Sequence, residues 1–202
     1  MQQSAVIIGG GLGGLFCGAI LSKEGVSVTV IEKNATVGGG LQSFTRFGEV
    51  FDTGMHVISG MQPGGNIRRI CEYLGIYDRL FIKDVDADVT DELYFAQDKT
   101  HYRIAQGKDG YVNALAEKFP DQRENLERYV DAMFRMVEEL DLLQLRPSSP
   151  TANLMHSEEF MISASDFVAK YITDERLRSV VSYINPLYGG RGGVTPAYIH
   201  AI

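Results

Sequence analysis

Residues 4–32, SAVIIGGGLGGLFCGAILSKEGVSVTVIE, decide the fold of this chain. The apolar run at 5–8 predicts a short strand buried on both faces. A helical pattern then runs from Leu12 to about Ser22, and a second apolar run at 26–31 predicts another strand. A strand, a helix and a strand in this order predict a βαβ unit, and therefore an α/β fold with a parallel sheet.

The turn between the first strand and the helix carries glycines in G-x-G-x-x-G register. Gly9 permits a tight turn, Gly11 lets the backbone approach a pyrophosphate, and Gly14 lets the helix pack on the strand. The helix N-terminus offers free N–H groups and a partial positive charge to phosphates. The predicted pyrophosphate loop consists of Gly9, Gly11, Leu12, Gly13 and Gly14.

An acidic residue ends the second strand. Glu32 lies where a carboxylate accepts both hydroxyls of an adenosine ribose, and Lys33 adjoins it. Because strand, helix and acid all stand at the required offsets, the stretch favours dinucleotide binding over a glycine-rich turn without function. The glutamate does not separate FAD from NAD.

A second glycine cluster follows at 38–40, and FDTGMH at 51–56 runs from a strand-like end into a turn. Three successive glycines favour close passage of another backbone or of a ligand. The pattern E-K-x(4)-G-G-G-x-x-S-F from Glu32, followed by F-D-T-G-x-H, resembles the N-terminal part of the phytoene desaturase, carotenoid isomerase and retinol saturase group. These are FAD-dependent oxidoreductases related to the amine oxidases. The close match covers about residues 4–60, and weaker similarity runs to the end.

The resemblance implies FAD as the cofactor and gives roles to several residues. The middle of the cofactor would be contacted by Gly38, Gly39, Gly40 and Leu41, and the flavin ring would lie near Gly54. Many members of the group carry arginine where this chain has Gly40, and the loss of that guanidinium points toward the retinol saturase side. His56 is either a packed, hydrogen-bonded histidine after the turn or a group that shapes the flavin or substrate face.

Composition excludes several function classes. The net charge of -7, with no Lys/Arg cluster, argues against a nucleic-acid partner. Cys17 and Cys71 are expected to be buried small hydrophobes, which suits a reducing, cytoplasmic setting. The histidines lack metal-ligand spacing, so no metal is predicted. No stretch has the length of a membrane span, although a lipid-like substrate would bring the protein to a membrane surface.

The remainder of the chain reads as helices with one small antiparallel hairpin. The hairpin is expected at 93–96 and 101–105. Helices are expected at 66–74 with Asn66 as cap, from 109 to 118, from 120 onward, at 165–171, at 174–184 with Thr173 as cap, and from 197. The long helix from residue 120 has a predicted core stripe of Leu126, Tyr129, Val130, Met133, Phe134, Val137 and Leu140.

These observations predict a Rossmann-like FAD-binding part at 1–75 and a mostly helical substrate region at 76–202. The expected function is an FAD-dependent oxidoreductase that desaturates, saturates or isomerises a hydrophobic, isoprenoid-like substrate. One alternative is an amine-oxidase-like or protoporphyrinogen-oxidase-like flavoenzyme, and another is a non-catalytic dinucleotide-binding module. The shortage of buried strands and a helix only beginning at residue 197 suggest a piece of a longer enzyme. No catalytic residue, electron acceptor or oligomeric state is assigned.

Overall fold

The computed structural model describes residues 3–147 and 156–202. The chain divides into two compact units, Met1–Phe81 (unit 1) and Ile82–Ile202 (unit 2). The division comes a few residues after the boundary predicted at residue 75.

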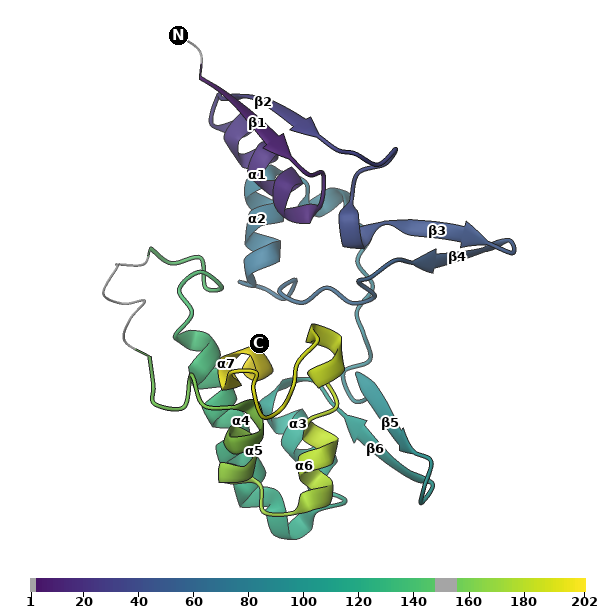
Figure 1. Cartoon of the computed structure of the whole chain (residues 1–202), viewed down its shortest axis with the longest axis vertical. Coiled ribbons are helices and arrows are strands. Elements are labelled where there is room, and N and C mark those ends of the chain that lie inside the picture. Colours follow the sequence, from purple (N-terminus) through teal and green to yellow (C-terminus); the bar gives the residue numbers. More distant parts are fainter. Residues whose placement is uncertain (1–2, 148–155) are drawn as a thin grey trace. The chain divides into compact units, whose positions relative to one another are not determined.

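Unit 1 begins with the predicted βαβ arrangement (Figure 1). The strands β1 (Ser4–Ile8) and β2 (Ser27–Ile31) pair in parallel, and α1 (Leu12–Lys23) connects them. Ser4 lies opposite Ser27 and Ile8 opposite Ile31. Both strands therefore end at the same edge of the sheet, which is where the glycine loop begins.

A hairpin and a capped helix complete unit 1. Its remaining elements are η1 (Gly39–Leu41), β3 (Ser43–Arg46), β4 (Glu49–Asp52), α2 (Asn66–Leu74) and η2 (Tyr77–Arg79). β3 and β4 form an antiparallel hairpin that extends away from the rest of the unit (Figure 1). Gly75 ends α2 in the left-handed conformation, as predicted, but the N-cap is Gly65 and Asn66 is the first helical residue.

The expectation of strands buried on both faces is wrong for the residues that the structure describes. Side chains of Ile7, Val28 and Val30 lie on the half-buried side that faces Gly18 of α1. On the opposite side, Val6 is 65% exposed and Ile8 88% exposed. An apolar sequence shows that a strand can be buried, but whether it is buried depends on which other element covers it. Cys17 is also exposed, contrary to expectation, while Cys71 is buried as expected.

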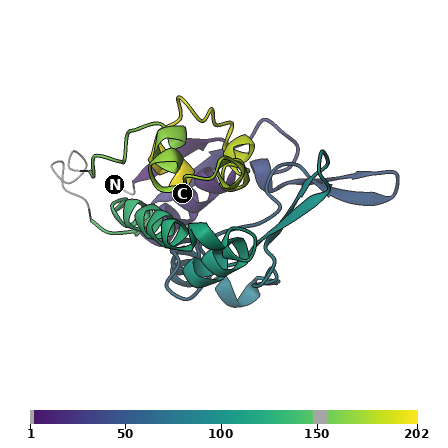
Figure 2. The ribbon, with the colours of Figure 1, turned by 90° about the horizontal axis from the view of Figure 1, so that it is seen from below.

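Unit 2 is a helical bundle beside one hairpin (Figures 1 and 2). Its elements are β5 (Asp91–Phe95), β6 (Thr100–Ile104), α3 (Gly107–Ala116), η3 (Pro120–Gln122), α4 (Arg123–Glu138), α5 (Ala164–Tyr171), α6 (Glu175–Val181), η5 (Asn185–Tyr188) and α7 (Ala197–Ala201). β5 and β6 pair antiparallel, with Leu93 opposite Tyr102. The predicted hairpin and helix positions are thus confirmed to within a few residues.

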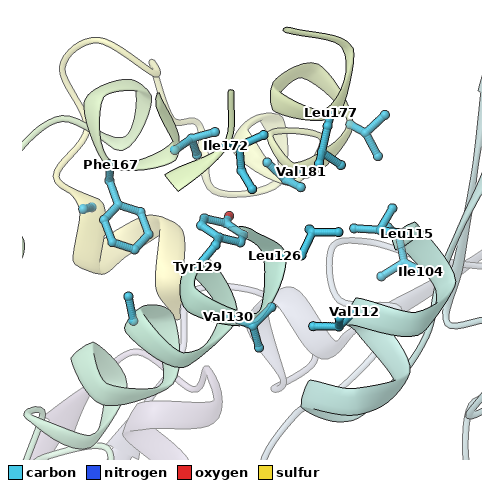
Figure 3. Close-up of a cluster of buried hydrophobic side chains, with 14 of the residues drawn as sticks. Ile104, Val112, Leu115, Leu126, Tyr129, Val130, Phe167, Ile172, Leu177 and Val181 are labelled. Atoms are coloured by element: carbon cyan, nitrogen blue, oxygen red, sulfur yellow. The ribbon is translucent and has the colours of Figure 1, made fainter. Parts of the chain in front are cut away.

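The hydrophobic core of unit 2 forms around α4 (Figure 3). Leu126, Tyr129 and Val130 are buried, as the stripe predicted. Phe134 is instead 43% exposed, and Met136 takes its place in the core at 1% exposure. At 3.6 residues per turn, position 136 lies on the face defined by 126, 129 and 133, whereas position 134 lies well off it.

The cap of α6 differs from prediction by one residue. Asp174 caps α6, and its carboxylate accepts the Leu177 amide at 2.8 Å. Thr173 is bonded elsewhere, because its amide and hydroxyl both donate to Gln122 Oε1. An aspartate and a threonine in succession are both good caps, so tertiary contacts select between them.

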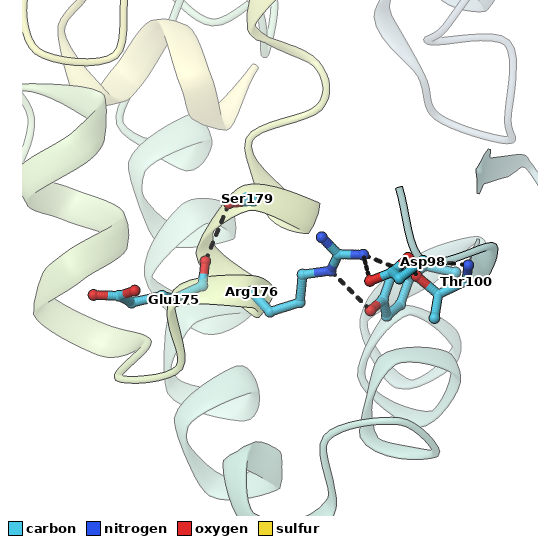
Figure 4. Close-up of polar contacts among 6 residues, drawn as sticks. Asp98, Thr100, Glu175, Arg176 and Ser179 are labelled. Atoms are coloured by element: carbon cyan, nitrogen blue, oxygen red, sulfur yellow. Dashed lines mark hydrogen bonds and ion pairs between the residues drawn. The ribbon is translucent and has the colours of Figure 1, made fainter. Parts of the chain in front are cut away.

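Arg176 of α6 links the β5–β6 hairpin to the bundle through hydrogen bonds (Figure 4). Its guanidinium donates to Asp98 at 2.5 Å, to Thr100 at 2.9 Å and to the Tyr102 hydroxyl at 3.1 Å. The guanidinium carbon also lies 3.8 Å from the Phe95 ring centroid. Among the described residues, no helix is both long enough and apolar enough to span a membrane.

Candidate functional site

The turn from β1 into α1 has the close packing that the glycine motif predicts. Gly9 has a φ of 106°, and its amide donates to Ile31 O of β2 at 2.8 Å. A Cβ added to Gly14 would lie well inside van der Waals distance of the Gly9 carbonyl oxygen. Only glycine at both positions allows α1 to begin this close to the end of β1.

The first turn of α1 presents backbone donors. The N-cap Gly11 has no side chain to accept them, and the first helical bond runs from the Leu15 amide to Gly11 O at 2.9 Å. The amides of Leu12, Gly13 and Gly14 precede this bond, so the helix itself does not use them. No atom lies within 4 Å of a Cβ added to Gly13, so its surroundings are open.

The second glycine cluster crosses the first at close range. The Gly38 amide donates to Gly10 O at 2.7 Å, and Gly11 and Gly38 form an isolated parallel bridge. Gly39 has a φ of 58°, and a Cβ on it would lie 3.1 Å from Gly11 Cα. The predicted close passage of another backbone is therefore present at the crossing of the two glycine clusters.

Glu32 binds the glycine loop directly. Its Oε2 accepts the Gly10 amide at 2.7 Å, and its Oε1 accepts the Asn34 amide at 2.8 Å. The backbone N–H groups of Asn34 and Gly10 hold the pKa of this carboxyl below its usual value. The carboxylate is thus charged, fixed at the end of β2 and half-buried, and each oxygen keeps a lone pair for a further donor. Lys33 beside it is exposed.

The turn after β4 lies against the second glycine cluster. The Met55 amide donates to Gly40 O at 3.0 Å, and a Cβ on Gly54 would lie 3.2 Å from the same oxygen. The structure thus brings Gly54 to Gly40. It leaves His56 exposed, with Nδ1 3.4 Å from Asp52 Oδ2.

Sequence reasoning missed two residues of this site. Gly10 is buried, donates to Glu32 and accepts from Gly38, so it joins three segments. Gln42 bonds the segments on either side of the second cluster. Gly10 stands between two glycines of the motif, and this position could have identified it as a residue of the site. Nothing in the sequence distinguished Gln42 from other polar loop residues.

A hollow lies in unit 2, away from the glycine loop in sequence. It has a volume of about 420 Å³ and lies along α3 and α4. Two of its charges form ion pairs, Lys108 with Asp131 at 2.7 Å and Arg123 with Glu127 at 3.4 Å. Within 3–147 and 156–202, no cluster of His, Cys, Asp or Glu side chains could hold a metal ion.

Comparison with known proteins agrees with the glycine-loop geometry. Residues 7–74 match the family model described as an NAD(P)-binding Rossmann-like domain. The chain is 29% identical to all-trans-retinol 13,14-reductase of Rattus norvegicus, over 100% of this chain and 35% of the relative. It is 26% identical to the chloroplastic prolycopene isomerase 1 of an Oncidium hybrid cultivar, over 89% of this chain and 32% of the relative. The chain thus spans about a third of the length of these relatives.

Solved structures share this fold at low sequence identity. A putrescine oxidase structure superposes with a TM-score of 0.63 at 20% identity, over 100% of this chain and 41% of that one. An oxidoreductase from Methanosarcina mazei gives 0.52 at 19% identity, over 93% and 38%. At these identities the likeness establishes the fold alone. The chain is thus similar in sequence to the retinol 13,14-reductases and prolycopene isomerases, and its glycine-loop geometry agrees with a Rossmann-like dinucleotide-binding fold.

Proposed function

We propose that unit 1 binds FAD and that the protein serves an FAD-dependent oxidoreductase reaction on a hydrophobic, isoprenoid-like substrate. The observation that carries the proposal is the crossing of the two glycine clusters beside Glu32. The Gly38–Gly10 bond of 2.7 Å and the 2.7 Å bond from Gly10 to Glu32 join the two glycine clusters to the acid, which supports a pyrophosphate loop beside a ribose acceptor.

The residues present fit a dinucleotide. The amides of Leu12, Gly13 and Gly14 are free of helical bonds and suit a pyrophosphate. Glu32, with Lys33 beside it, suits the adenosine ribose, and its charged form accepts hydroxyl donors. A Cβ at Gly39 would meet Gly11, which supports a cradle whose shape depends on glycine.

The middle and far end of the cofactor are proposed to lie along Gly38, Gly39, Gly40 and Leu41, with Gly54 toward the ring end. When bound, FAD would supply the hydride exchange with substrate carbon, while these residues bind and orient it. His56 is exposed beside Asp52 and is a candidate for contact with the flavin or the substrate. The names of the relatives, a retinol reductase and a prolycopene isomerase, support a polyene-type substrate.

The proposed substrate and the net charge also suggest where the protein works and which partners it has. A hydrophobic substrate of this class resides in lipid, so the protein would work in the cytoplasm and in part at membrane surfaces. The net charge of -7 opposes a nucleic-acid partner.

The test is retention of flavin by the purified chain. FAD is added, the excess is removed, and an absorption band near about 450 nm is measured. Parallel titrations with ADP and NAD identify the half of the cofactor that is recognised. Retained FAD supports the proposal. Binding of ADP without retention of FAD would favour a non-catalytic nucleotide-binding module, and preference for NAD would refute FAD as the cofactor.

A matched pair of glycine variants sharpens this test. Gly39→Ala introduces a side chain at a φ of 58° and at the crossing with Gly11. Gly64→Ala introduces the same backbone strain, at a φ of 79°, where nothing lies within 4 Å of the new Cβ. Only the first variant should lose FAD.

A further inference from the structure

Gln42 is bonded to three separate segments around the second glycine cluster. Its side-chain Nε2 donates to Thr36 O at 2.6 Å, before the cluster. Its amide donates to Gly39 O at 3.1 Å, within the cluster. Its carbonyl oxygen accepts both the Thr53 amide at 2.9 Å and the Thr53 hydroxyl at 2.8 Å, from the segment that leads to Gly54.

The side chain also packs against the cluster. A Cβ on Gly38 would lie 3.1 Å from Gln42 Cγ, and Gly38 has a φ of 124°, which side chains rarely adopt. Besides the Met55 amide on Gly40 O, two further sets of contacts hold the cluster. One comes from Gly10, through its carbonyl oxygen, and the other from Gln42.

We propose that Gln42 is a positioning residue that fixes residues 38–41 for the middle of the bound dinucleotide. It need not touch the cofactor, because its bonds end on Thr36, Gly39 and Thr53. This role rests on the proposed function. Glu32 at the adenosine end takes its bonds from the Gly10 and Asn34 amides, so Gln42 reaches it only indirectly, through Gly38 and Gly10.

The proposal predicts a difference between two ligands. FAD extends along residues 38–41, whereas ADP ends at the pyrophosphate and relies on Glu32 and the first glycine loop. Gln42→Met keeps the length of the side chain and removes its donor to Thr36. We expect about a tenfold weaker affinity for FAD, the scale of one lost hydrogen bond, and an affinity for ADP within about twofold of the starting protein.

Two further variants support the comparison. Thr53→Val removes the hydroxyl bond to Gln42 O and keeps the amide bond. It should lower the affinity for FAD relative to that for ADP, but by less than Gln42→Met does. Gln106→Met makes the same chemical change at an exposed glutamine of unit 2 and should leave both affinities unchanged. A general loss of stability would weaken both ligands together, so the ratio separates positioning from misfolding.

Hydrogen exchange provides a readout that needs no ligand. The amides of Leu41 and Gln42 donate to Gly38 O and Gly39 O, both at 3.1 Å, and should exchange faster in Gln42→Met than in the unchanged chain. Equal weakening of FAD and ADP, or unchanged FAD affinity, would overturn the positioning role. If the unchanged chain binds no FAD, the proposed function fails. Exchange of these two amides that is no faster in Gln42→Met than in the unchanged chain would then overturn the positioning role as well.

Discussion

The Tyr129 hydroxyl lies 2.6 Å from Nε2 of His200, and both side chains are 1% exposed in unit 2. On its other side, His200 Nδ1 lies 3.3 Å from Asn185 Oδ1. Because that oxygen can only accept, the proton belongs on Nδ1, and Nε2 accepts from Tyr129. His200 is therefore neutral, and it joins α7 to α4.

This pair predicts acid sensitivity of unit 2. Burial lowers the pKa of His200 from 6.5 to about 4, so the unfolded chain binds the proton more readily than the folded one. Stability should be full above pH 6.5 and fall by up to about 3 kcal/mol as the pH drops toward 4. Urea unfolding at several pH values measures this. His200→Gln should flatten the dependence, whereas the exposed His101→Gln should not. An unchanged slope in His200→Gln would contradict the assignment.

Glu32→Gln should weaken ADP and FAD by a similar factor, about tenfold, because the variant loses the charge and one acceptor at the adenosine end. This uniform loss contrasts with the selective loss expected for Gln42→Met. The lowered pKa of Glu32 also predicts that its carboxyl stays charged as the pH falls from 7 to 5, so the difference in ADP affinity between Glu32→Gln and the unchanged chain should stay constant over this range. Calorimetric titration measures both. Glu49→Gln on the exposed hairpin is the control, and equal effects of the two substitutions would count against Glu32.

Gly14→Ala and Gly13→Ala should differ although both add one methyl group. The first places a Cβ against the Gly9 carbonyl oxygen and should destabilise unit 1 by about 1–3 kcal/mol. The second meets nothing within 4 Å and gains helix propensity, about 0.5–1 kcal/mol. Denaturant unfolding of each variant measures the difference. Similar stability of the two variants would show that α1 is able to move away from β1.

Arg176→Gln should loosen the β5–β6 hairpin. The variant loses the contacts with Asp98, Thr100 and the Phe95 ring, so the hairpin should open more readily. Amide exchange in β5 and β6 should rise. Arg103→Gln makes the same change on exposed β6 and should have little effect. If both variants exchange alike, Arg176 is not what holds the hairpin.

Some positions could be predicted because neighbouring residues alone determine them. The turn at Gly9, the Gly75 C-cap and the parallel pairing of β1 with β2 follow from local conformational preference and from spacing. The core side of α4 was correct at Leu126 and Tyr129 and wrong at Phe134, because an apolar residue beside a stripe is buried only where another element covers it.

The sequence by itself determined that this chain contains a βαβ unit with a glycine loop, an acid at the end of β2 and a helical second unit. These features depend on periodicity and on residues close together in the chain. Only the tertiary structure decided that Gly38 crosses Gly10, that Gln42 joins Thr36 to Thr53, that Tyr129 meets His200 and that one side of β1 lies bare. Such contacts join residues far apart in sequence, and their geometry depends on how the elements pack.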